Sequence, residues 1–144
     1  MIIIDAKDLI VGRFATYAAK QALLGEEIAV VNCEKAYITG TRQHVLDEFK
    51  RKRSMGTWAT GPFYHRQPDR LVRRMIRGML PHKQEKGRLA YQRIMCYIGV
   101  PYQFKEQKME TVENSKITKV PNLKYVSIRE ISQALGAKRT GEQE

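Results

Sequence analysis

Residues 2–31 read IIIDAKDLIVGRFATYAAKQALLGEEIAVV, where two short β-branched runs flank a segment with helical spacing. The runs 2–4 and 28–31 contain no polar residue, as is typical of strands buried on both faces of a sheet. Between them, four alanines lie at the i, i+3, i+4 and i+7 positions of one helical face, at residues 15, 18, 19 and 22. Gly25 ends the helix predicted over 12–24. The order strand, helix, strand predicts a parallel sheet with both faces covered.

The rest of the chain predicts further elements of the same α/β class. We expect a third strand at 36–38, a helix from the N-cap Thr41 to about 53, a loop at 54–67, a helix that begins with Pro68, a short helix at 87–93 and a strand at 94–98. Residues 103–122 lack periodicity and predict an irregular surface segment. A strand at 124–126, a last helix with the capping box Ser127–Glu130 and a frayed tail at 138–144 complete the expected single domain, residues 1–144.

The charge of the chain is concentrated in its middle third. Residues 42–93 hold 14 Lys and Arg against 4 acids, which is +10 of the formal net charge of +11. Residues 1–41 sum to −1 and residues 94–144 to +2. A field of this size and polarity attracts polyanions, and together with aromatic residues it is typical of a nucleic-acid-binding surface.

The predicted helix from Pro68 to Leu80 carries the sharpest pattern in this basic segment. Four arginines at the i, i+3, i+4 and i+7 positions form one stripe, at residues 70, 73, 74 and 77, and apolar residues occupy the opposite side. A solvated charged face usually interleaves acids, but Asp69 is the only acid in this helix. Since the arginine fork binds phosphate in a bidentate manner, we expect four outward guanidinium groups that bind a polyanion.

The loop before this helix mixes glycines, aromatic residues and cations. Exposed aromatic side chains beside arginine can stack on unpaired bases, whereas Trp58 and Phe63 could equally cover the core. Both interpretations stay open. The residues predicted to contact nucleic acid are Lys50, Arg51, Lys52, Arg53, Trp58, His65, Arg66, Arg70, Arg73, Arg74, Arg77, His82, Lys83, Lys86 and Arg88.

Motifs for catalysis or cofactor binding are incomplete in this sequence. Gly56 and Gly61 have the outer spacing of a phosphate-binding loop, but Pro62 stands where that loop needs lysine. The three histidines show no ligand or triad spacing, and the two cysteines, Cys33 and Cys96, lie in apolar runs that predict burial. We therefore expect no enzyme activity, metal, cofactor or small-molecule substrate. The apolar runs are too short for a signal peptide or membrane span, so a soluble intracellular protein without a membrane partner is expected.

A pattern with fixed spacings runs from Ile76 to Gly99. It begins IRGMLP, continues after five residues with Gly87-Arg88, and ends after five more with IMCYIG at 94–99. With the Ile4-Asp5-Ala6 start and Val31–Ala36, this pattern resembles the ribosomal protein L13 (uL13) family over about residues 1–102. The segment GPFYHRQP at 61–68 is similar to the archaeal and eukaryotic branch. The long basic C-terminal helix of eukaryotic members is absent, so an archaeal-type member is expected.

The resemblance implies a three-layer α/β/α fold around a mostly parallel sheet of about four strands. It also implies a structural, non-catalytic component of the cytoplasmic ribosome that binds large-subunit (23S-type) rRNA, neighbours other large-subunit proteins and supports subunit assembly. Two further classes of function stay open. One is a regulatory RNA-binding protein or assembly factor, and the other is an RNA-modifying enzyme on a Rossmann-like sheet, which the missing glycine motifs disfavour.

Overall fold

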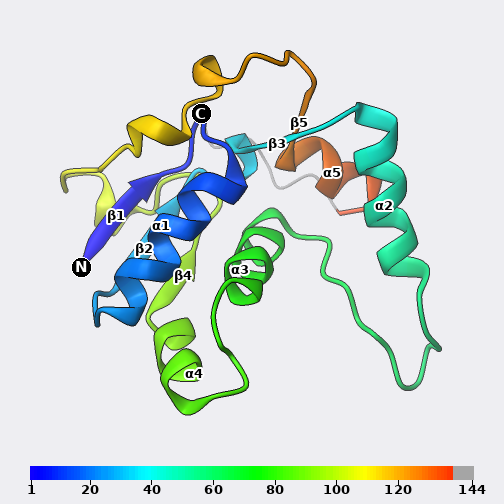
Figure 1. Ribbon diagram of the computed structural model, residues 1–144, viewed down its shortest axis with the longest axis horizontal. Coiled ribbons are helices and arrows are strands. Elements are labelled where there is room, and N and C mark those ends of the chain that lie inside the picture. Colours follow the sequence, from blue (N-terminus) through cyan, green and yellow to red (C-terminus); the bar gives the residue numbers. More distant parts are fainter. Residues whose placement is uncertain (138–144) are drawn as a thin grey trace.

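A three-stranded parallel sheet lies at the centre of the protein, for which a computed structural model describes residues 1–137 (Figure 1). The strand order is β1-β2-β4, with β1 at Ile2–Asp5, β2 at Ile28–Val31 and β4 at Ile94–Cys96. The two apolar runs that open the sequence pair in register, Ile2 with Ile28 and Ile4 with Val30. The predicted strand–helix–strand unit is therefore confirmed.

Three helices cover one face of this sheet. They are α1 (Val11–Leu23), α3 (Pro68–Gly78) and α4 (Glu85–Gln92). The four alanines of the α1 face are buried, and their small side chains allow α1 to approach its neighbours closely. Ile4, Val30 and Ile94 point into the same core, where Phe14 of α1 is fully buried.

The other face of the sheet is covered by irregular chain. Ile3, Ala29 and Val31 form a separate buried cluster with Phe104 of the 3₁₀ turn η2 (Tyr102–Phe104). Two more 3₁₀ turns, η3 (Glu113–Ser115) and η4 (Ile117–Lys119), follow in the segment that was expected to be irregular. The predicted α/β class holds, with helices forming one outer layer and a 3₁₀ turn with extended chain forming the other.

A second, two-stranded sheet explains why the central sheet has three strands rather than about four. β3 (Tyr37–Thr39) pairs antiparallel with β5 (Tyr125–Ser127) instead of joining the parallel sheet. Helices α2 (Arg42–Ser54) and α5 (Ile128–Ala134) flank this pair. The Ser127 hydroxyl accepts a hydrogen bond from the Glu130 amide at 3.2 Å, as the capping pattern predicts.

Three remaining expectations concern single segments. Cys33 and Cys96 are both buried and unpaired, and a hydrogen bond with Cys96 together with burial raises the pKa of the Cys33 thiol. The predicted frayed tail, residues 138–144, lies outside the described residues. Within residues 1–137, no helix combines the length and the apolar character that a membrane crossing requires.

Gly87 provides a test of the close packing between α4 and the turn before it. A Cβ at this position would lie 2.1 Å from the carbonyl oxygen of Pro81, whereas one at Gly12 of α1 would meet no atom within 4 Å. Gly87→Ala is expected to lower the free energy of unfolding by about 1–3 kcal/mol, because rigid backbone must move. Gly12→Ala should raise it by about 0.5–1 kcal/mol. Urea unfolding of both variants checks this, and equal stabilities would contradict the packing described.

Candidate nucleic-acid interface

Helix α3 positions the arginine stripe by burying its opposite side. Pro68 occupies the first turn of the helix, and Leu71, Val72 and Ile76 are fully excluded from solvent. Their burial fixes the rotation of the helix about its axis. The residues at positions 70, 73, 74 and 77 consequently share the side that faces away from the core, as their spacing predicts.

The four arginines of the stripe do not all face outward, which corrects the prediction. The Arg74 guanidinium lies 4.2 Å from the Tyr64 ring centre and donates a hydrogen bond to the Phe63 carbonyl at 3.0 Å. The Arg73 guanidinium lies 4.5 Å from the Tyr91 ring centre and donates to the Tyr91 carbonyl at 3.5 Å. Both side chains are half-buried, because each guanidinium lies over an aromatic ring and also reaches a backbone carbonyl.

The other two arginines of the stripe have different surroundings. Arg70 is exposed and Arg77 is half-buried, and neither has a hydrogen-bond or ion-pair partner among the described residues. The stripe therefore divides into two arginines that fasten neighbouring segments to α3 and two that are available to an external anion.

The basic end of α2 is divided in a similar way. Arg51 and Lys52 both contact the Glu48 carboxylate, at 2.8 Å and 3.3 Å. The hydrogen bond from Arg51, followed by that from Lys52, lowers the pKa of Glu48 to about 2. Arg53 donates to the Tyr64 carbonyl at 2.8 Å, while Lys50 is exposed with no such partner among the described residues.

A hairpin without charged residues, residues 55–64, projects between α2 and α3. The Thr57 carbonyl accepts a hydrogen bond from the Gly61 amide at 3.0 Å, which brings the two arms together. Gly56 has φ +80°, and a Cβ there would lie 1.8 Å from the Gly61 carbonyl oxygen, so the turn requires glycine. The exposed fraction is 93% for Trp58 and 65% for Phe63, which excludes the alternative that these side chains cover the core.

The chain returns from the hairpin to α3 along helix α5. The Arg66 guanidinium donates to the Gly136 carbonyl at 3.3 Å, and the Arg66 carbonyl accepts from the Ser132 hydroxyl at 2.6 Å. His65, beside it, is exposed. These contacts hold the end of the loop in place, so Arg66, which was predicted to contact nucleic acid, has a role in the fold.

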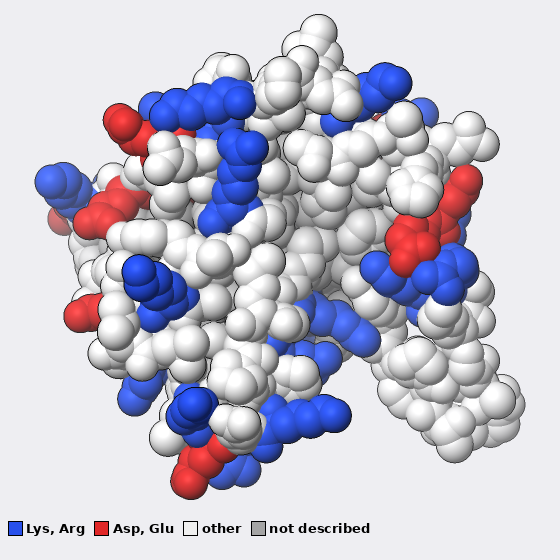
Figure 2. Space-filling view, in the orientation of Figure 1, with Lys and Arg blue, Asp and Glu red and all other residues white. Residues whose placement is uncertain are grey.

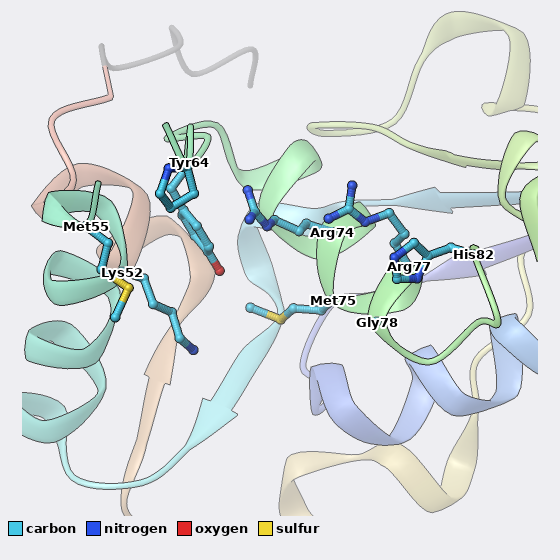
Figure 3. A pocket seen from close by; sticks show the side chains of 9 residues that line it. Lys52, Met55, Tyr64, Arg74, Met75, Arg77, Gly78 and His82 are labelled. Atoms are coloured by element: carbon cyan, nitrogen blue, oxygen red, sulfur yellow. The ribbon is translucent and has the colours of Figure 1, made fainter. Parts of the chain in front are cut away.

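A pocket of about 380 Å³ opens between α2, the hairpin and α3 (Figure 3). It brings together predicted residues from three parts of the chain, namely Lys52 from α2, Arg74 and Arg77 from α3, and His82 from the turn after α3. Figure 2 shows Lys and Arg side chains beside a hollow on this face, and a projecting part that carries no charge. The predicted cations Lys83, Lys86 and Arg88 lie outside the pocket lining, exposed on the next turn and on α4.

Several residues of this site were missed by sequence reasoning. Tyr64 and Tyr91 support the two fastening arginines, and Met55, Met75 and Gly78 line the pocket. Their contacts join a loop or another helix to α3, so no periodicity within one element could have indicated them. Among the described residues, no group of His, Cys, Asp or Glu is arranged to hold a metal ion.

The sequence of residues 1–103 matches the family model of ribosomal protein L13. The chain is 41% identical over 138 residues to the large ribosomal subunit protein uL13 of Methanococcoides burtonii, covering 96% of this chain and 99% of that protein. It is 40% identical over 139 residues to the protein of the same name from Haloarcula marismortui, covering 96% and 93%. The corresponding values for the Methanosarcina barkeri protein are 42% over 139 residues, covering 96% and 99%. These matches agree with the resemblance and the archaeal type expected from the sequence.

The two kinds of arginine on α3 should respond differently to truncation. Arg74→Ala is expected to lower the free energy of unfolding by about 1–2 kcal/mol, because it removes a charged hydrogen bond and a cation–π contact. Arg70→Ala should change it by less than about 0.5 kcal/mol. Urea unfolding gives both values, and amide hydrogen exchange of residues 55–64 should accelerate only in Arg74→Ala. Identical behaviour of the two variants would show that Arg74 does not fasten the loop.

Proposed function

Because the chain belongs to the ribosomal protein L13 family, a family of ribosomal proteins and not a class of enzymes, we propose that it is a structural constituent of the large ribosomal subunit. Its partners in this proposal are large-subunit rRNA and neighbouring large-subunit proteins, and its location is the cytoplasmic ribosome. The name and the near-complete coverage of the archaeal relatives support this assignment. The chain acts as one domain whose basic segment, residues 42–93, binds rRNA and supports subunit assembly.

The observation that carries the proposal is the placement of unpartnered cations around a scaffold that is already fixed. Lys50, Arg70 and Arg77 have no acidic partner among the described residues, and neither have three exposed cations farther along, Lys83, Lys86 and Arg88. Like charges on one basic segment repel, and an external polyanion that neutralises them removes this repulsion. The phosphates of folded RNA supply such a polyanion.

In this proposal Arg73 and Arg74, the arginines that fasten neighbouring segments to α3, bind phosphate in a different way from Arg70 and Arg77. Arg73 and Arg74 have fixed orientations, because each guanidinium donates to a carbonyl and lies over an aromatic ring. Donors on their guanidinium groups that remain free can bind phosphate without a large further loss of side-chain entropy. Trp58, at the tip of the neutral hairpin, presents an aromatic face for stacking on an unpaired base.

Binding to deproteinised large-subunit rRNA is expected to weaken steeply with salt. Each neutralised phosphate contributes about 0.7–0.9 to the log–log slope. The double variant Arg70→Ala plus Arg77→Ala should therefore lower the slope by about 1–2, with little change in thermal stability. A matched control, Lys20→Ala plus Lys108→Ala, removes two exposed cations from outside the basic segment and should leave the slope within about 0.5. Filter binding over a salt series measures all three proteins, and a flat wild-type profile would contradict the electrostatic interface.

Stoichiometry separates a structural constituent from a regulatory or assembly factor. We expect about one copy per large subunit to remain bound after a high-salt wash, since a constituent is enclosed by folded rRNA and other proteins. Quantitative mass spectrometry of sedimented subunits provides the measurement. A substoichiometric amount, or complete release by the wash, would favour the factor and overturn the proposal of a constituent.

A further inference from the structure

The pocket between α2 and α3 combines two kinds of surface. Met55, Met75, Pro62 and the ring of Tyr64 give it apolar walls, while Lys52, Arg74, Arg77 and His82 supply its cations and its imidazole. None of its nine lining residues is acidic. Its volume of about 380 Å³ falls within the range of roughly 300–1,000 Å³ typical of small-molecule pockets.

The cations and the apolar walls occupy the same small space, as Figure 3 shows. The Arg74 guanidinium covers the Tyr64 ring at 4.2 Å, and the edge of that ring meets Phe49 with 6.1 Å between centroids. A guanidinium plane backed by an aromatic ring is a surface on which a nucleobase can stack. Arg77, which has no partner among the described residues, is available to a phosphate attached to the same nucleotide.

Gly78 lines this pocket without a side chain. It is the last residue of α3 and lies on the helix face of Arg74 and Met75, four and three positions later. A Cβ built there meets no atom within 4 Å, and its φ lies outside the left-handed region. The backbone would therefore accept another residue, so glycine at this position preserves space instead of satisfying a turn.

We infer that the pocket receives one unstacked nucleotide of the bound rRNA, its base against Arg74 and the methionines and its phosphate at Arg77. This inference rests on the proposed rRNA binding and adds where one nucleotide is held. An apolar protein side chain would fill the space between the walls but leave Arg74 and Arg77 without a counterion. A phosphate alone would neutralise the cations but leave the apolar walls exposed, so a nucleotide matches both surfaces.

Filling the pocket without changing charge tests the inference. Gly78→Leu and Gly78→Gln place an apolar and a polar side chain in the same space, and Gly12→Leu makes the matched change on α1. Both Gly78 variants should bind large-subunit rRNA about tenfold or more weakly, since stacking of one base is worth on that order. Their salt slope should fall by no more than about 0.9, because only the phosphate held at Arg77 is lost and every other cation keeps its contact. Gly12→Leu should bind within about twofold of wild type, and thermal melting verifies that each variant is folded.

The outcomes distinguish this inference from the proposed function. Wild-type affinity in both Gly78 variants, with a steep salt slope, would overturn nucleotide insertion while leaving rRNA binding intact. A flat salt slope in the wild type would instead contradict the proposed rRNA binding itself. Weakened binding at Gly78 with Gly12→Leu unaffected supports an occupied pocket.

Methyl signals of methionine identify the chemical class of the occupant. The free protein, labelled at its methionine methyl groups, is titrated with millimolar uridine or adenosine monophosphate and separately with inorganic phosphate. Nucleotides should shift the signals of Met55 and Met75 through the ring current of the base, while Met95 and Met109 outside the pocket stay unchanged. Equal shifts with phosphate, or shifts with neither probe, would overturn the assignment of a base to this pocket.

Discussion

Burial of one side of α3 determines how the arginines, the hairpin and the pocket beside this helix are oriented. Leu71, Val72 and Ile76 are fully buried against the central sheet and α1. Burial of each such side chain stabilises by about 1.5–3 kcal/mol relative to exposure. An isolated helix of 11 residues is marginal in water, so this packing, more than helix propensity, maintains α3. The orientation of the four arginines, of the hairpin fastened to them and of the pocket follows from it.

The same surface uses arginine for two physical purposes. Arg73 and Arg74 are held against tyrosine rings and backbone carbonyls, whereas Arg70 and Arg77 have no partner among the described residues. A planar fork with five donors can bond a carbonyl on one edge and keep other donors free. Lysine can place its charge over a ring, as Lys52 does over Phe49 at 5.4 Å, but it lacks the planar fork whose edges bond in two directions. The basic segment is thus partly a structural element.

Local patterns in the sequence were sufficient to predict most of the secondary structure. The alanine face of α1, Pro68 at the start of α3 and the Ser127–Glu130 cap each depend on neighbours within about one helical turn. The sequence did not indicate which strands join the central sheet, because Tyr37 pairs with Ser127, 90 positions later, and short apolar runs do not specify their partners. The arginine stripe was located correctly, but the outward orientation of Arg73 and Arg74 was wrong, since Tyr91 and Tyr64 belong to other elements. The pocket was not predictable for the same reason.

The packing partners of α2 are the last elements of the described chain. Val45 and Phe49 bury the inner side of α2 in a core shared with Val126 of β5 and with Ile131 and Leu135 of α5. A chain is synthesised from its N-terminus, so early segments emerge before the later segments against which they pack. The end of α2 and the hairpin beside it therefore acquire their final positions only after β5 and α5 have been made. Synthesis of α5, rather than emergence of the basic segment, is the event that completes the surface proposed to bind rRNA.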